Sequence, residues 1–118
     1  MNRRSRGAEG EYLVHDYLAG QRIRVLDMNY RRATGEIDVI AQEGATVVFI
    51  EVKRRTTARF GSPAEAVTPV KRARIVRTAL LYLQQNRLMD APVRFDVVEL
   101  TPGEIRHIRG AFDASDIL

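Results

Sequence analysis

Hydrophobic and polar residues alternate in two runs within residues 36–53, and this alternation predicts a β-hairpin. Both runs are rich in β-branched residues, and the glycine between them permits a tight turn. If Gly44 and Ala45 form the loop, the pairing of the two strands places Asp38 opposite Glu51. The pattern therefore predicts the register of the hairpin as well as its existence.

Side chains of a strand point alternately to its two faces, so the predicted hairpin has two different faces. One face is wholly apolar and carries Ile37, Val39, Ala41, Val48, Ile50 and Val52. The other face is apolar only near the turn, where it carries Ile40, Val47 and Phe49. Its open end carries Glu36, Asp38, Glu51 and Lys53. A half-solvated hairpin would scatter polar residues along its outer face, so this gathering of charge requires an explanation.

Two carboxylates that face each other on neighbouring strands lie about 5 Å apart at Cβ, and their repulsion destabilises the sheet. A hard divalent cation such as Mg²⁺ takes oxygen ligands and would turn the repulsion between Asp38 and Glu51 into attraction. Lys53 projects on the same face as Glu51, where it could orient or deprotonate a water beside the metal. The alternative is a surface network of these charges with arginines, which binds no ligand and contributes little stability. The residues alone leave both interpretations open.

The rest of the chain predicts helices and further strands on both sides of the hairpin. The predicted elements are a helix over 7–19 stopped by Gly20, a strand over 23–30, a helix from Pro69 to about Asn86 with Thr68 as N-cap, a strand over 93–100 and a short edge strand over 104–109. The first helix is expected to bury Leu13, Val14, Tyr17 and Leu18. The second is expected to bury Ala73, Val76, Ala79, Leu80 and Leu83.

The order of these elements predicts the fold class. The order α-β-β-β-α-β, followed by the extra edge strand, favours an α/β fold in which helices flank a mixed sheet. The second helix has the length that a crossover between parallel strands requires. The 118 residues predict a single domain, with a basic arm over 1–6, a basic loop over 54–67 and a tail over 110–118 that includes one helical turn.

Composition narrows the functional classes. The absence of cysteine excludes disulfides, zinc–thiolate sites and thiol nucleophiles. No apolar run approaches the roughly 18 residues of a membrane span, and the N-terminus lacks the apolar core of a signal peptide. We therefore expect a cytoplasmic protein that has no membrane partner.

The charge of the chain is compatible with a nucleic-acid partner. It has 19 Lys and Arg against 15 Asp and Glu, a net charge of +4, and most of the basic residues are arginine. Planar guanidinium groups suit bidentate contacts with phosphate. The basic residues expected to flank the charged end of the hairpin are Arg31, Arg32, Arg54, Arg55, Arg59, Lys71 and Arg74. The alternatives are an ordinary solvated helix edge and a connecting loop without a ligand.

Two carboxylates border the apolar stripe of the first predicted helix. Glu11 lies on one border and Glu9 on the other, so helical geometry alone does not decide which of them reaches the sheet. Compensation of the helix dipole is the alternative role for both.

Taken together, Glu11, Asp38 and the run Glu51-Val52-Lys53 resemble the PD-(D/E)XK nuclease superfamily. A closer resemblance, over residues 7 to about 100, is to the YraN-like family, a set of uncharacterised bacterial proteins similar to archaeal Holliday junction resolvases. The motifs that carry this resemblance are Gly10-Glu11, Gly35-Glu36-Ile37-Asp38, Phe49-Ile50-Glu51-Val52-Lys53, Phe60-Gly61 and Arg94-Phe95-Asp96-Val97-Val98. Ile37 stands where the superfamily nominally has proline, a position that many members relax.

The resemblance implies a restriction-endonuclease-like core that hydrolyses phosphodiester bonds in branched or single-stranded DNA during repair or recombination. It implies that Asp38, Glu51 and the backbone carbonyl of Val52 hold Mg²⁺ or Mn²⁺. Glu11 would complete the acidic cluster, and Glu36 is an additional candidate.

The resemblance also implies roles for two lysines. Lys53 would position the attacking water and stabilise the charge that develops at phosphorus, and Lys71 would lie near the scissile phosphate. Because some members of such families keep the fold as a binding platform, the alternative is a non-catalytic nucleic-acid-binding accessory module with a vestigial acidic site. The joint retention of the acidic residues and Lys53 favours the enzyme.

We expect DNA rather than RNA as the partner. None of the candidate basic residues has an evident partner that reads base edges, so binding should depend on salt and on nucleic-acid shape rather than on sequence. Two copies of the chain could pair as a homodimer to span a junction.

Overall fold

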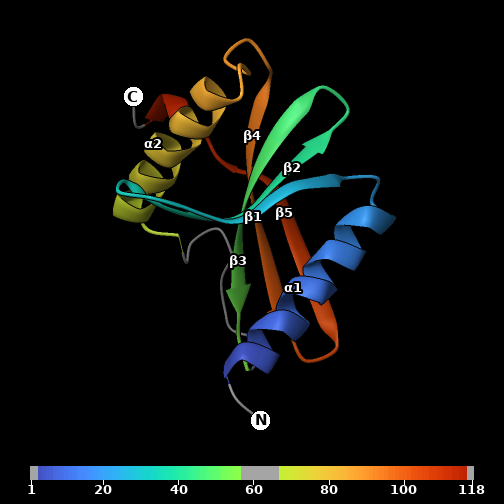
Figure 1. Ribbon diagram of the computed structural model, residues 1–118. Helices are drawn as coiled ribbons and strands as arrows, with labels where there is room; N and C mark the ends of the chain where they lie inside the picture. The colour runs from blue at the N-terminus through green and yellow to red at the C-terminus, as the bar shows by residue number, and fades with distance from the viewer. Residues whose placement is uncertain (1–2, 57–66, 117–118) are drawn as a thin grey trace.

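The computed structural model describes residues 3–56 and 67–116, and it describes side chains within 10–56 and 67–115. Its elements are α1 (Arg3–Gly20), β1 (Arg24–Arg32), β2 (Gly35–Glu43), β3 (Thr46–Arg54), α2 (Pro69–Gln85), β4 (Val93–Thr101), β5 (Glu104–Phe112) and a 3₁₀ turn (Ala114–Asp116), shown in Figure 1. The candidate Arg59 and the Phe60-Gly61 motif lie outside the described residues. No helix in the described ranges is long and apolar enough to cross a membrane.

The described strands form one sheet of five in the order β1-β2-β3-β4-β5. Only β3 and β4 run parallel, and α2 is the crossover that joins them, whereas the other neighbours are antiparallel. The two helices lie on opposite sides of this sheet (Figure 1), each over its own apolar cluster. The predicted α/β class is confirmed, and the arrangement is compatible with a restriction-endonuclease-like core.

Helix α2 begins as its sequence predicts. The hydroxyl of Thr68 accepts a hydrogen bond from the backbone N–H of Lys71 at 3.3 Å, and proline occupies the first turn, where its missing N–H costs nothing. The buried face is Ile75, Val76, Thr78, Ala79, Tyr82 and Leu83. The predicted stripe was wrong at Ala73 and Leu80, which are only half-buried. The face is rotated because Thr78 can be buried, as its hydroxyl hydrogen-bonds with that of Thr34 at 2.7 Å.

Helix α1 is longer than predicted and is turned slightly differently. It begins at Arg3, so most of the segment predicted as a basic arm belongs to the helix. Val14 and Leu18 are fully buried, as expected, but the side chain of Leu13 is 52% exposed. Gly10 is buried instead, so the helix approaches the sheet along the line of residues 10, 14 and 18.

The hairpin of β2 and β3 has the predicted register, in which Glu43 pairs with Thr46. This pairing continues only to Val39 and Ile50, and beyond that point β2 stays paired with β1 alone. Ile37 packs in the cluster beneath α2 rather than with Val39, so its predicted place on the other face was wrong.

The change of face coincides with an unusual backbone conformation on the neighbouring strand. Asn29 on β1 lies between the pairs Met28–Val39 and Tyr30–Ile37, and its φ of 55° is in the left-handed region, which asparagine tolerates better than most residues. The register continues without a shift here, but both strands change face together: Met28 and Val39 pack on the α1 side, whereas Tyr30 and Ile37 pack on the α2 side. Because the pairing of β2 with β3 ends at Val39 and Ile50, a fork lies between these two strands.

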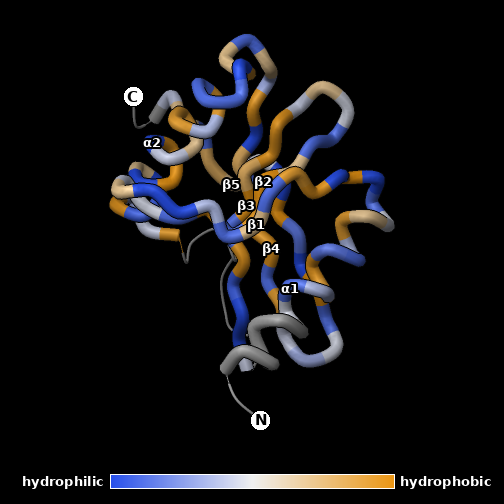
Figure 2. Tube along the Cα trace, in the orientation of Figure 1, coloured by the Kyte–Doolittle hydropathy of each residue, from blue (hydrophilic) through white to orange (hydrophobic). Residues whose placement is uncertain are grey.

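The last strand is longer than predicted. Strand β5 runs to Phe112, so the prediction that residues 110–112 begin an irregular tail was wrong. Gly110, with φ of 62°, lies at an irregularity in the β4–β5 pairing, after which Phe112 pairs with Phe95 and their rings stack at 5.0 Å. Figure 2 shows the hydrophobic residues gathered along the strands in the middle of the molecule.

A buried network of hydrogen bonds connects α1 with β4 and β5. Asp96 on β4 accepts hydrogen bonds from the guanidinium of Arg94, at 2.9 and 3.1 Å, and from the backbone N–H of Gly110 at 2.9 Å. It also bonds to Nε2 of His107 at 2.8 Å, and Nδ1 of His107 bonds to the hydroxyl of Tyr17 on α1 at 2.9 Å. Because every member has a partner, the network stabilises the sheet despite its burial.

Candidate acidic site at the open end of the hairpin

The fork between β2 and β3 positions Asp38. Its Oδ2 atom accepts a hydrogen bond from the backbone N–H of Val52 at 2.8 Å. The carboxylate thus accepts the hydrogen bond of a β3 backbone N–H that has no backbone partner on β2, because the pairing of the two strands has already ended. The carboxylate is held beside the run Glu51-Val52-Lys53, although the strand that carries it has turned away.

Glu51 is buried, with 6% of its side chain exposed. Nζ of Lys71, from the first turn of α2, hydrogen-bonds to Oε1 of Glu51. Nζ of Lys53 lies 3.8 Å from the same oxygen. Two ammonium groups from different elements therefore converge on one carboxylate oxygen, and the crossover helix brings the second of them there.

The charges at this site perturb one another. Burial, followed by repulsion from Glu51, raises the pKa of Asp38 to about 6, although the Val52 N–H opposes the change. Burial and then the proximity of Lys71 lower the pKa of Lys53. Burial alone would also lower the pKa of Lys71, but its hydrogen bond to Glu51 helps to reverse the direction, and the pKa is raised. Such mutual perturbation is typical of functional sites and also of structural ion-pair networks.

The donor set of Asp38 and Glu51 fits a hard divalent cation. Among the side chains of residues 10–56 and 67–115, no three His, Asp or Glu gather closely enough to hold a metal ion. Mg²⁺ does not require three, because it commonly takes one or two protein carboxylates and completes its octahedron with waters and substrate phosphates. The repulsion that raises the pKa of Asp38 is the kind of strain that a cation relieves.

Glu11 lies on the α1 side of the fork. It lines a cavity of about 200 Å³ together with Asp38, and Asn29 and Arg54 also form part of the wall of this cavity. The side-chain amide of Asn29 donates to Oε1 of Glu11 at 2.8 Å. The structure therefore brings Glu11 to Asp38 through a shared cavity, while the side chain of Glu9 lies outside the described set.

The candidate Glu36 has a different partner. Its Oε1 atom lies 3.2 Å from Nε of Arg31, and both side chains are exposed. Glu36 still contributes to the raised pKa of Asp38 through its charge, but less than Glu51 does. The structure thus places it at the edge of the acidic site rather than in its centre.

The predicted basic residues fall into two groups. Arg31 and Arg32 lie at the β1–β2 turn, which reaches α2 where Arg74 packs against Gly35. Arg32 lies over the ring of Tyr30, with its guanidinium carbon 4.0 Å from the ring centre. The second group lies at the C-terminal end of β3. Arg54 lines the same cavity as Glu11, and Nε of Arg55 lies 3.2 Å from the carboxylate of Glu99. Lys71 lies between the groups, at Glu51.

Several residues at or near the site escaped the sequence analysis. Asn29 gave no signal, because its role depends on a backbone irregularity. Glu99 did leave one, since it is a charged residue inside the apolar run of the predicted strand 93–100 and is only 1% exposed. Arg106, which pairs with it, was read only as part of an edge strand.

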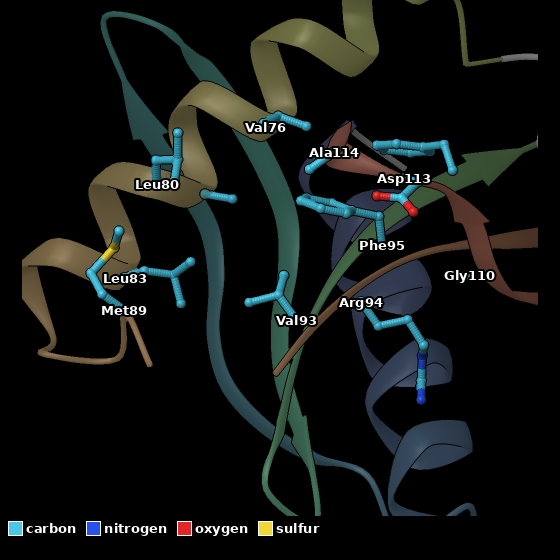
Figure 3. A pocket seen from close by; sticks show the side chains of 12 residues that line it. Val76, Leu80, Leu83, Met89, Val93, Arg94, Phe95, Gly110, Asp113 and Ala114 are labelled. Atoms are coloured by element: carbon cyan, nitrogen blue, oxygen red, sulfur yellow. The ribbon is translucent and has the colours of Figure 1, made fainter. Parts of the chain in front are cut away.

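A cavity larger than the one beside Glu11 lies away from the acidic site. A hollow of about 640 Å³ lies between α2 and the beginning of β4 and end of β5, and Figure 3 shows it lined by apolar side chains that include Val76, Leu83 and Phe95. The acidic residues lie at the other end of the parallel pair, because Glu51 pairs with Val97 and Lys53 with Glu99. The chemistry of the residues, and not the size of a hollow, locates the candidate site.

Comparison with known proteins places the chain in a family. Residues 10–100 match the family described as Uncharacterised protein family UPF0102. Among proteins named UPF0102, the chain is 51% identical over 109 residues to one from Mycolicibacterium vanbaalenii, covering 88% of this chain and 90% of that protein. It is 46% identical over 115 residues to one from Lachnoclostridium phytofermentans, covering 97% and 98%. The resemblance to the YraN-like family is thereby confirmed, and the chain belongs to the UPF0102 family.

Proposed function

We propose that this protein is a metal-dependent phosphodiesterase that cuts branched or single-stranded DNA in repair or recombination in the cytoplasm. We also propose that it is related to the PD-(D/E)XK nucleases and the archaeal Holliday junction resolvases. One observation carries the proposal: Asp38 is held by the Val52 N–H at a fork beside buried Glu51 and two lysines. Burial and the repulsion from Glu51 raise the pKa of Asp38, and a divalent cation held between the two carboxylates would relieve that repulsion.

The residues have distinct tasks in this chemistry. Asp38, Glu51 and the Val52 carbonyl would hold Mg²⁺ or Mn²⁺, and Glu11 would act from the adjoining cavity. A bound divalent ion supplies an acidified water and charge stabilisation at phosphorus. Lys53, whose pKa burial lowers, orients the attacking water through Nζ.

Lys71 has a task on the substrate side. Its side chain is 41% exposed, so its ammonium can reach a bound phosphate and stabilise the charge that develops on the phosphate oxygens. The arginines on both sides of the site hold the nucleic-acid backbone by charge, so binding weakens as salt rises and does not discriminate sequence.

A second function is favoured by one observation. The Lys71 and Lys53 ammonium groups already compensate Glu51 without a metal ion. The site would then be a stable ionic cluster on a non-catalytic nucleic-acid-binding module. The two functions differ in whether a divalent ion is required.

The deciding experiment is cleavage of labelled single-stranded, duplex and four-way-junction DNA in Mn²⁺, Mg²⁺ or EDTA. We expect cleavage of at least one substrate in Mn²⁺ or Mg²⁺ and none in EDTA, with loss in the Asp38→Asn and Glu51→Gln variants. Asp90→Asn is the matched control, because Asp90 is exposed in the loop before β4. Binding without metal-dependent cleavage of any substrate would favour the accessory module.

A further inference from the structure

A row of charged side chains crosses three strands beside the proposed site. Lys53 on β3 pairs with Glu99 on β4, and Glu99 pairs with Arg106 on β5. Residues directly opposite each other on neighbouring strands project from the same face of a sheet. Arg55 follows Lys53 by two residues and reaches the same carboxylate from the end of β3. The row therefore begins at the site and runs outward to the edge of the sheet.

Glu99 is the buried centre of this row. Its side chain is 1% exposed, and it lies between Nε of Arg55, 3.2 Å from Oε2, and a terminal nitrogen of Arg106, 3.5 Å from Oε1. Oε2 is buried and, among the described residues, has no well-aligned hydrogen-bond donor. A buried carboxylate in such a setting is costly, and replacing an ion pair by apolar residues is often neutral or stabilising. Stability alone therefore gives little reason for Glu99.

The arrangement does explain the orientation of the arginines. A guanidinium has five N–H donors in a fixed plane, and within the described part of the chain each of these two uses only the contact with Glu99 for an ion pair. The side chains of Arg55 and Arg106 are 20% and 37% exposed, so their outer edges reach solvent. Two guanidinium groups on one carboxylate leave a net positive charge, which suits an anion with several oxygens.

We propose that Arg55 and Arg106, oriented by buried Glu99, form a binding site for a phosphodiester of the strand whose neighbouring phosphate lies at the acidic site. Adjacent strands are about 4.8 Å apart, so Arg106 lies about 10 Å from Lys53 across the sheet. The inference rests on the proposed function, because nucleic acid must be the ligand, but it does not require cleavage. It adds Arg106 and Glu99 to the substrate-binding residues and gives the bound strand a direction, outward from Lys53 across β4 to β5.

The test is binding of a fluorescein-labelled single-stranded DNA to the full chain in EDTA, measured by anisotropy over a salt series. Arg106→Gln should weaken binding about fivefold to tenfold and lower the slope of log affinity against log salt by about 0.7. Arg109→Gln is the matched control, because Arg109 lies on the same strand and also pairs with one glutamate at 3.5 Å, but towards the other end. Equal losses in the two variants would overturn the proposal.

Neutral linkages identify the phosphate. A series of oligonucleotides carries one uncharged methylphosphonate linkage each, at successive positions. At one position the neutral linkage should weaken DNA binding by the wild type but should not weaken DNA binding by Arg106→Gln any further. Inorganic phosphate at a few millimolar, at constant ionic strength, should not displace the DNA. Displacement that depends on Arg106 would assign the site to free phosphate and overturn the assignment to a diester.

Glu99→Gln separates orientation from net charge. The substitution raises the net charge by one, so simple attraction predicts tighter binding, whereas loss of orientation predicts weaker binding. We expect weaker binding, with the melting temperature recorded alongside; if this buried variant does not fold, the variant of the partly exposed Arg106 decides. If DNA binding depends on Arg106 but no substrate is cleaved in Mn²⁺, the proposed enzyme activity is rejected and this binding site is kept. If the wild type cleaves DNA but Arg106→Gln and Arg109→Gln bind DNA equally well, only this binding site is rejected.

Discussion

The side chain of Asp38 and the backbone of Val52 are joined where β2 and β3 separate, through a hydrogen bond of 2.8 Å from the Val52 N–H to Oδ2. One carboxylate thus completes the hydrogen bonding of the sheet and also faces the repulsion of Glu51. Removing its charge should relieve the repulsion, and removing its oxygen should break the sheet contact. The two effects can be separated by substitution.

The stability of the metal-free protein should fall as pH rises from about 4 to 7. The folded state raises the pKa of Asp38 from 3.8 to about 6, so it binds the proton more tightly than the unfolded state does. The resulting stabilisation is complete below the unfolded pKa and is lost as pH rises through about 6, in total about 3 kcal/mol. Urea unfolding in EDTA, followed by circular dichroism across this range, measures it.

Asp38→Asn provides the control for this pH dependence. Asparagine can still accept from the Val52 N–H, but it does not titrate, so the variant should lose this part of the slope and exceed the wild type in stability at pH 7. Parallel curves for the two proteins would show that Asp38 is not the titrating group.

Lys71→Met should make the protein more dependent on a divalent ion. The variant leaves Glu51 with only Lys53, 3.8 Å away, and should lose about 1 kcal/mol of stability in EDTA. Mn²⁺ should then raise its melting temperature by more than it raises that of the wild type, because only the more distant Lys53 ammonium still competes for Glu51. Lys71→Arg, which keeps a cation there, should resemble the wild type, and equal Mn²⁺ shifts in all three would contradict the competition.

Gly35→Ala should be more destabilising than Gly44→Ala. Both glycines have positive φ, 149° and 59°. A Cβ at Gly35 would also lie 3.3 Å from Cβ of Arg74 and from the hydroxyl of Thr78, whereas nothing lies within 4 Å at Gly44. We expect losses of about 2 and about 1 kcal/mol in denaturant unfolding. Equal losses of stability in the two variants would mean that α2 can shift away from residue 35 at no energetic cost.

Asp96→Asn should cost about 2 kcal/mol, because it leaves the guanidinium of Arg94 with the half-buried Glu43 in place of two carboxylates. Tyr17→Phe removes only the bond to His107 from the same network and should cost about 1 kcal/mol. Chemical unfolding of both variants measures the difference. A cost for Asp96→Asn no larger than that for Tyr17→Phe would show that the carboxylate is not the centre of the network.

The parts of the fold that depend on local pattern were predictable from the sequence. The turn at Gly44 fixes the register of the hairpin, and Thr68-Pro69 fixes the start of α2. Both follow from a few neighbouring residues whose conformations are restricted, so long-range contacts have little power to alter them.

The failures have a common physical origin. Ile37 changes face opposite Asn29, a residue of another strand whose φ is positive, and Leu13 is exposed because Gly10 lets α1 approach along a different line. For the site, the sequence grouped Asp38 with Glu51 but could not place Lys71 on the same oxygen, because that contact depends on how the crossover packs. Pairing of Arg55 and Arg106 through Glu99 likewise requires knowledge of the sheet order.

The parallel pairing of β3 with β4 has a consequence during folding. Strands β1 to β3 are joined by short turns and can pair early, whereas β4 can join only after α2 has crossed the sheet. Until then β3 is an open edge that exposes Val47-Val48-Phe49-Ile50, an uncharged run of high β-propensity and therefore an aggregation hazard. Truncation before β4 should accordingly yield insoluble protein, and substitutions that slow the docking of α2 should lower soluble yield at high expression even where the final fold is unaffected.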